Sequence, residues 1–135
     1  MPNKPTLNKN ILVVEDDADA RDTLCMILVS LGYTPVPFAD AKEALAGLQD
    51  QKIDLALLDI LMPEMNGYEL LEELRKIPAY TDTPVIMVTA KDGDSEILEG
   101  YKYGADYYIT KPYTAKQLEY GIRLFLFPET SSDAS

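Results

Sequence analysis

The chain contains no histidine among its 135 residues. It therefore cannot be a histidine autokinase or a histidine phosphotransfer module. The same absence excludes Ser-His and Cys-His catalytic pairs and removes the commonest zinc ligand. If the protein performs phosphoryl chemistry, the phosphoryl donor must be another molecule.

Cysteine and long apolar segments are also scarce. The only cysteine is Cys25, which excludes an internal disulfide and fits the reducing cytosol. We expect Cys25 to be a small buried helix residue rather than a reactive thiol. No apolar run reaches the roughly 18 residues of a membrane span. The first ten residues are polar and lack the apolar stretch of a signal peptide. The prediction is a cytoplasmic protein with no membrane partner.

Basic residues are few, with 12 lysines and arginines against 23 acidic residues and a formal net charge of −11. They form no cluster along the sequence. Nucleic acid would repel such a chain, so direct binding to DNA or RNA is not expected. The length suits one domain with a hydrophobic core.

Short apolar runs alternate with segments of helical periodicity along the whole chain. Strands are predicted at Ile11–Val14, Thr34–Phe38, Leu55–Leu58, Pro84–Val88 and Tyr107–Ile109. Helices are predicted at Ala18–Leu31, Asp40–Gln49 (with Asp40 as its N-cap), Tyr68–Lys76, Ser95–Tyr103 and Thr114–Phe127. This alternation predicts a doubly wound α/β fold, with a parallel sheet and helices on both faces. The domain should span residues 10–127, between flexible termini at 1–9 and 128–135.

Acidic residues directly follow two of the predicted strands. Asp59 ends the apolar run that begins at Ile53, and Glu15 and Asp16 follow the first strand. The carboxyl ends of parallel strands share one edge of the sheet, so these carboxylates should converge. Mg²⁺ prefers such oxygen ligands and would relieve their mutual repulsion. We expect Asp16 and Asp59 as direct ligands, Glu15 acting through water, and the backbone carbonyl of Leu61 completing the set.

Two further polar residues end other predicted strands and would support phosphoryl chemistry on Asp59. Thr89 ends the fourth strand and Lys111 follows the fifth. Asp59 would act as a nucleophile, while the Lys111 ammonium and the Thr89 hydroxyl stabilise the phosphoryl group. A cis bond between Lys111 and Pro112 would turn the chain and aim the lysine inward.

The whole pattern resembles the receiver domain of two-component response regulators, over about Asn10 to Phe127. The matching motifs are Glu15-Asp16, Asp59, Thr89 and Lys111-Pro112. The resemblance implies a flavodoxin-like fold with strand order 2-1-3-4-5. It also implies that Asp59 accepts a phosphoryl group, with Mg²⁺, from a phosphohistidine on a sensor histidine kinase or a histidine phosphotransfer protein. Such a protein is a signalling phosphoacceptor rather than an enzyme with sustained turnover.

The resemblance further implies a conformational switch. Thr89 and Tyr108 occupy the family's switch positions, since Tyr108 lies three residues before Lys111. Their rearrangement would alter the face made by the fourth helix, fifth strand and fifth helix, where a downstream effector protein or domain would dock. The other tyrosines considered are expected at the surface or at interfaces: Tyr68, Tyr80, Tyr101 and Tyr103.

Two other classes of function remain open. The first is a Mg²⁺-dependent phosphatase or phosphotransferase that turns over through an aspartyl-phosphate. Such phosphatases usually carry a second aspartate two residues after the nucleophile, where this chain has Leu61. Without a nearby general acid or base, turnover should be slow. The second is a nucleotide or flavin binder, which is disfavoured because no glycine-rich loop follows the first strand.

Overall fold

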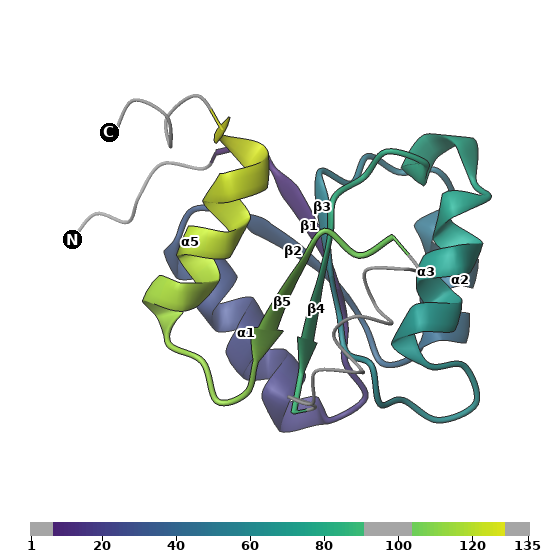
Figure 1. The fold of residues 1–135 in the computed structure, drawn as a ribbon, viewed down its shortest axis with the longest axis horizontal. Helices are drawn as coiled ribbons and strands as arrows, with labels where there is room; N and C mark the ends of the chain where they lie inside the picture. Colours follow the sequence, from purple (N-terminus) through teal and green to yellow (C-terminus); the bar gives the residue numbers. More distant parts are fainter. Residues whose placement is uncertain (1–6, 91–103, 129–135) are drawn as a thin grey trace.

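The computed structural model describes residues 7–90 and 104–128, which form a five-stranded parallel sheet with helices on both faces (Figure 1). The strand order is β2-β1-β3-β4-β5, as predicted. The strands are β1 (Asn10–Val14), β2 (Thr34–Phe38), β3 (Leu55–Leu58), β4 (Val85–Thr89) and β5 (Tyr107–Thr110). The helices are α1 (Ala18–Ser30), α2 (Ala41–Leu48), α3 (Gly67–Arg75), the short 3₁₀-helix η1 (Pro78–Tyr80) and α5 (Ala115–Leu126).

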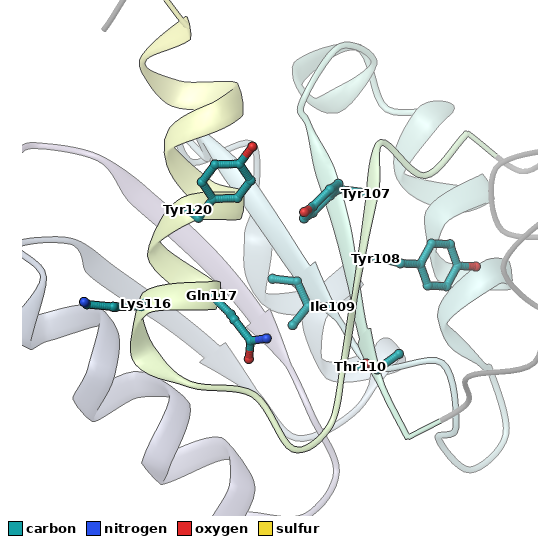
Figure 2. A pocket seen from close by; sticks show the side chains of 7 residues that line it. All are labelled: Tyr107, Tyr108, Ile109, Thr110, Lys116, Gln117 and Tyr120. Atoms are coloured by element: carbon teal, nitrogen blue, oxygen red, sulfur yellow. The ribbon is translucent and has the colours of Figure 1, made fainter. Parts of the chain in front are cut away.

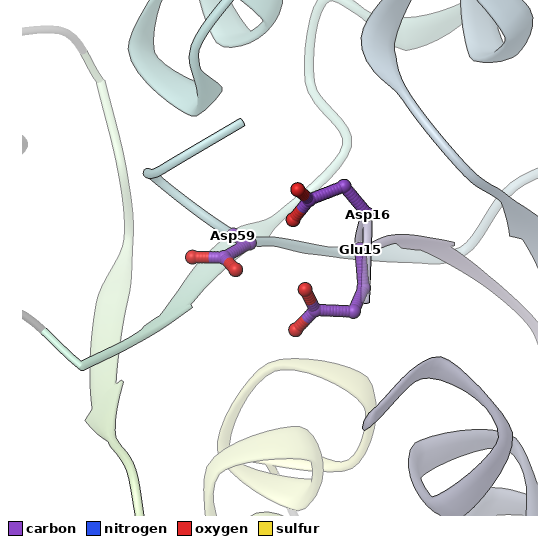
Figure 3. Close-up of side chains that lie close together, drawn as sticks. All are labelled: Glu15, Asp16 and Asp59. Atoms are coloured by element: carbon purple, nitrogen blue, oxygen red, sulfur yellow. The ribbon is translucent and has the colours of Figure 1, made fainter. Parts of the chain in front are cut away.

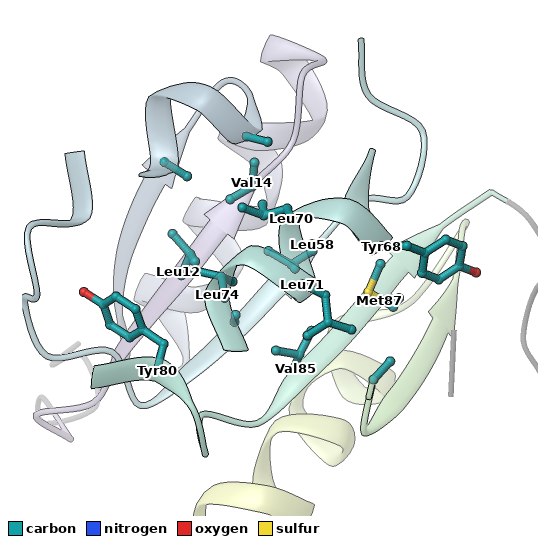
Figure 4. Packing of buried hydrophobic residues seen from close by; sticks show 14 of the residues in the cluster. Leu12, Val14, Leu58, Tyr68, Leu70, Leu71, Leu74, Tyr80, Val85 and Met87 are labelled. Atoms are coloured by element: carbon teal, nitrogen blue, oxygen red, sulfur yellow. The ribbon is translucent and has the colours of Figure 1, made fainter. Parts of the chain in front are cut away.

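The sheet separates two hydrophobic cores. Alternate residues of the central strands point to opposite faces, so Leu12 and Leu58 pack with α2 and α3 (Figure 4). Ile11 and Leu57 pack with α1 and α5 on the other face. Because helices cover both faces, every residue of β3 is buried. This explains why the sequence before Asp59 is a continuous apolar run.

The strand at one edge of the sheet contains two prolines. Pro35 and Pro37 lie in β2, which pairs only with β1 among the described strands. Proline has no backbone N–H and cannot complete a ladder on two sides. The two prolines therefore suit the edge position that β2 occupies.

The four described α-helices begin at side chains that accept hydrogen bonds from the first turn. Asp17 caps α1 and accepts from the backbone N–H of Ala20, and the predicted cap Asp40 accepts from the backbone N–H of Glu43. Helix α3 begins with a capping box formed by Asn66 and Glu69, and α5 with a second one. The ends of the described helices and strands agree with their predicted boundaries to within one or two residues.

The expectation that Tyr68 and Tyr80 lie at the surface is wrong. Tyr68 is 8% exposed and Tyr80 is 2% exposed, both in the core beneath α3 and η1. Each ring can be buried because its hydroxyl has a partner. The Tyr80 hydroxyl donates to the carbonyl of Gln51 at 2.9 Å, and the Tyr68 hydroxyl lies 2.6 Å from that of Tyr108.

Several expectations fall outside the described residues. They include the helix at Ser95–Tyr103, with Tyr101 and Tyr103, and most of the two ends expected to be flexible. Cys25 is described, and it is half-buried against the α1–α5 core rather than fully buried. None of the described helices is long and apolar enough to cross a membrane.

Candidate functional site

Three carboxylates meet at the carboxyl edge of the sheet (Figure 3). Glu15 and Asp16 follow β1, and Asp59 follows β3. These two strands are parallel neighbours in the sheet. One oxygen from each lies within 4.8 Å of the others. Glu15 and Asp59 are 4% and 8% exposed, whereas Asp16 is open to solvent. Burying negative charges so close together is unfavourable unless a cation is near.

Lys111 supplies a positive charge to this cluster. Its ammonium nitrogen lies 2.6 Å from Oε1 of Glu15 and 3.4 Å from Oδ2 of Asp59. Burial lowers the pKa of Lys111, but the hydrogen bond to Glu15 and the charge of Asp59 outweigh it, so the pKa lies above its usual value. Lys111 is therefore protonated at neutral pH.

A backbone hydrogen bond holds Lys111 beside the end of β4. The Lys111 backbone N–H donates to the carbonyl of Thr89 at 2.8 Å, which ties the end of β5 to the end of β4. The peptide bond between Lys111 and Pro112 is cis, as predicted.

Backbone N–H groups orient two of the carboxylates, and one arginine binds the backbone beside them. Oε2 of Glu15 accepts from the N–H of Asp17, and Oδ1 of Asp59 accepts from the N–H of Leu61, both at 3.2 Å. The Arg21 guanidinium donates to the carbonyl of Glu15 at 2.8 Å. Sequence reasoning missed Arg21. Its position in the sequence could have indicated this role. Arg21 lies one turn after the N-cap of α1, and from there its side chain can reach back to the turn between β1 and α1.

Thr89 and Tyr108 lie on adjacent strands and on the same face of the sheet. Tyr108 pairs across from Met87, two residues before Thr89 along β4, so the two are diagonal neighbours. Thr89 is fully buried, and Tyr108 is half-buried with its hydroxyl beside that of Tyr68. Leu61 is half-exposed at the mouth of the site, next to Asp59.

Gly67 is a second residue whose importance the sequence did not reveal. Its N–H donates to the carbonyl of Ile60 at 2.9 Å, which closes the loop after Asp59. A Cβ atom at Gly67 would clash with the carbonyl oxygen of Asp59 and would lie 2.7 Å from Cε of Met87. The start of α3 therefore packs directly against the backbone of Asp59.

We predict that Gly67→Ala destabilises the protein by about 1–3 kcal/mol, the range for forcing an extra carbon into a packed site. The backbone oxygen of Asp59 cannot move without moving the site itself. Gly121→Ala in α5 is the matched control, because its Cβ would meet only side-chain atoms, the nearest at 3.1 Å. Helix propensity favours alanine there and offsets the crowding. Urea unfolding measures both changes, and equal effects would contradict this account of Gly67.

The donor atoms of the cluster suit a hard divalent cation. Carboxylates of Glu15, Asp16 and Asp59 offer oxygen ligands, and the exposed side of Asp16 leaves the cluster open to water. Mg²⁺ binds through one or two carboxylates and retains several waters. The cluster is thus compatible with Mg²⁺ binding. The Lys111 ammonium contacts both Glu15 and Asp59, so the site can accommodate further negative charge.

Comparison with known proteins identifies the class. The family model of the response regulator receiver domain matches residues 11–123. The chain is 41% identical over 118 residues to the probable transcriptional regulator ycf27 of Cyanophora paradoxa, covering 87% of this chain and 48% of that protein. The structure of the chemotaxis protein CheY4 of Vibrio cholerae superposes with a TM-score of 0.83 at 30% identity, covering 87% of this chain and 98% of that one. The receiver domain of the sensor histidine kinase PA1611 of Pseudomonas aeruginosa, solved with a magnesium ion in its active site cleft, has a TM-score of 0.81 at 26% identity, covering 87% and 97% of the two chains.

The chain belongs to the family of response regulator receiver domains, which act in two-component signal transduction. The fold is the flavodoxin-like arrangement of CheY-type proteins, as predicted. The chain spans about half the length of the curated relatives it matches.

Proposed function

We propose that Asp59 is the phosphoacceptor of this receiver domain and takes its phosphoryl group from a phosphohistidine of a sensor histidine kinase or a histidine phosphotransfer protein. The observation that carries the proposal is the position of the Asp59 carboxylate, which belongs to the acidic cluster and lies 3.4 Å from the Lys111 ammonium. A cytoplasmic location is part of this proposal.

In the proposed step, a carboxylate oxygen of Asp59 attacks the phosphorus of the phosphohistidine. A P–O bond to Asp59 forms as the P–N bond breaks, and the imidazole nitrogen keeps the electron pair and takes up a proton. Lys111, already beside Asp59, would compensate the added charge of the phosphoryl oxygens. Thr89, at the end of the neighbouring strand β4, would donate a hydrogen bond to them.

Mg²⁺ would be held by Asp16 and Asp59, by Glu15 through water, and by the backbone carbonyl of Leu61. When bound, it would neutralise negative charge on the carboxylates and on the phosphoryl oxygens. Glu15 suits the outer position because Lys111 binds its Oε1 closely, at 2.6 Å, whereas the contact of Lys111 with Asp59 is longer, at 3.4 Å.

The proposed output is the docking of a downstream effector protein or domain at the β5–α5 surface. A groove of about 320 Å³ lies there, lined by both strand and helix (Figure 2). Tyr107 and Tyr120 contribute aromatic rings to it, and Tyr120 is largely exposed. Exposed aromatic side chains are typical of protein contacts. The fourth helix, which the sequence analysis placed on this face, lies outside the described residues. No direct contact with nucleic acid is proposed for this acidic chain.

Intact-mass spectrometry after incubation with acetyl phosphate tests the proposal. We expect one added phosphoryl group with Mg²⁺ and none when EDTA replaces it. Peptide mapping after borohydride reduction, which converts an acyl phosphate into an alcohol, should place the modification at Asp59. An adduct elsewhere, or one that forms equally in EDTA, would contradict the proposed chemistry.

The alternative of a phosphatase that turns over through Asp59 is not favoured. Leu61 stands where such enzymes carry their second aspartate, and its half-exposed apolar side chain cannot transfer a proton. Release of inorganic phosphate well beyond one equivalent from small phosphate esters would support the alternative.

A further inference from the structure

Two tyrosine hydroxyls form a hydrogen bond between α3 and β5. The hydroxyl oxygens of Tyr68 and Tyr108 lie 2.6 Å apart. Tyr68 is buried beside Met87 at the end of the α2–α3 core that faces β5 (Figure 4). Tyr108 turns away from Tyr107 and Tyr120, toward α3 (Figure 2). The bond is therefore partly shielded from water and joins the side chain of Tyr108 to a rigid helix.

The helix end that carries Tyr68 is packed against the proposed phosphoacceptor. Tyr68 follows Gly67, whose Cα has no room for a side chain beside the Asp59 carbonyl. On the other strand, Tyr108 lies three residues before Lys111, which pairs with Asp59 and Glu15. The Tyr68–Tyr108 pair thus links two segments that both end at the acidic cluster.

We infer that Tyr68 is a positioning residue that holds Tyr108 in the orientation of the unmodified protein. The inference rests on the proposed function and on the switch that the resemblance to receiver domains implies, in which Tyr108 moves when Asp59 acquires a phosphoryl group. The hydrogen bond belongs to the state in which Asp59 pairs with Lys111 and carries no modification. The movement of Tyr108 in the switch would break this bond, so the bond opposes the switch, because a ligand must overcome any free energy that favours the other conformation.

Removal of the Tyr68 hydroxyl should therefore ease activation. Tyr68→Phe keeps the buried ring and deletes only the hydroxyl. The net value of one hydrogen bond corresponds to about a 2- to 10-fold change in an equilibrium constant. We expect the apparent Kd for beryllofluoride, a phosphoryl mimic that binds carboxylates in the presence of Mg²⁺, to fall by this factor. An NMR titration of the full chain at saturating Mg²⁺ measures it.

Tyr80→Phe is the matched control. Tyr80 is another buried tyrosine, and its hydroxyl donates to the carbonyl of Gln51, near the start of β3. Its substitution should leave the beryllofluoride Kd unchanged. Tyr108→Phe should abolish the effect of Tyr68→Phe, because the pair is already broken. In ring-labelled protein without beryllofluoride, the Tyr108 resonances of Tyr68→Phe should move toward their positions in the saturated wild type.

An unchanged or raised Kd in Tyr68→Phe would overturn the inference, as would a lowered Kd that persists in the Tyr108→Phe background. Failure of the proposed function has a different signature. In that case the wild type would bind no beryllofluoride, or Asp59→Asn would bind it equally well, and the inferred role of Tyr68 would fall with it. Wild-type binding that requires Asp59, with the same Kd in Tyr68→Phe, would remove the role of Tyr68 alone.

Discussion

Asp59→Asn is expected to abolish the phosphoryl adduct entirely. The asparagine amide has nearly the same shape as the carboxylate and can still accept from the N–H of Leu61, so the loop should keep its structure. An amide oxygen is, however, a very poor nucleophile toward phosphorus, and no acyl phosphate can form. The substitution also removes one of the three carboxylates of the cluster, so Mg²⁺ affinity should fall by about tenfold or more. Mass spectrometry and calorimetric titration with Mg²⁺ measure the two effects.

Asp17→Asn is the matched control for this substitution. Asp17 is two residues from Glu15, and the substitution removes the same charge. Asparagine caps helices about as well as aspartate, so the hydrogen bond to the N–H of Ala20 should persist. Phosphorylation of Asp17→Asn should match that of the wild type. If the adduct survived in Asp59→Asn, or disappeared equally in Asp17→Asn, the assignment of Asp59 as the acceptor would be wrong.

The sequence was sufficient to predict the elements that carry the site. The apolar runs before Glu15 and Asp59 predict strands buried on both faces, and residues after such strands converge at one edge of the sheet. The prolines of β2 predict an edge strand for an equally local reason. The strand order came from the resemblance to receiver domains, because alternation alone does not determine which strands pair.

Contacts that depend on three-dimensional packing could not be predicted. The burial of Tyr68 depends on a hydroxyl partner 40 residues away in β5, and no periodicity within α3 specifies such a partner. The close contact of Gly67 with the Asp59 carbonyl, which excludes a side chain there, is likewise set by packing and not by a local pattern. The sequence placed Lys111 at the site but did not indicate that its shortest contact is with Glu15.

Lys111→Gln should change Mg²⁺ binding and phosphorylation in opposite directions. The ammonium lies 2.6 Å from Glu15 and 3.4 Å from Asp59, so it competes with any cation for the same carboxylates. Its removal should tighten Mg²⁺ binding by about tenfold, or about 1.4 kcal/mol, which is a fraction of the Coulomb energy of charges at this distance. Phosphorylation by acetyl phosphate should nonetheless slow by about 100-fold, the typical effect of deleting one group that stabilises developing charge.

The unfolding temperature separates the two roles of Lys111. Without Mg²⁺, Lys111→Gln leaves two buried carboxylates close together with no ammonium beside them, so it should unfold below the wild type. Mg²⁺ should restore most of this stability, because a ligand that binds only the folded state stabilises it by mass action. Lys116→Gln in α5, an exposed lysine with the same loss of charge, should change neither stability nor phosphorylation. If Lys111→Gln bound Mg²⁺ more weakly than the wild type, Lys111 would be organising the carboxylates for the cation rather than competing with it.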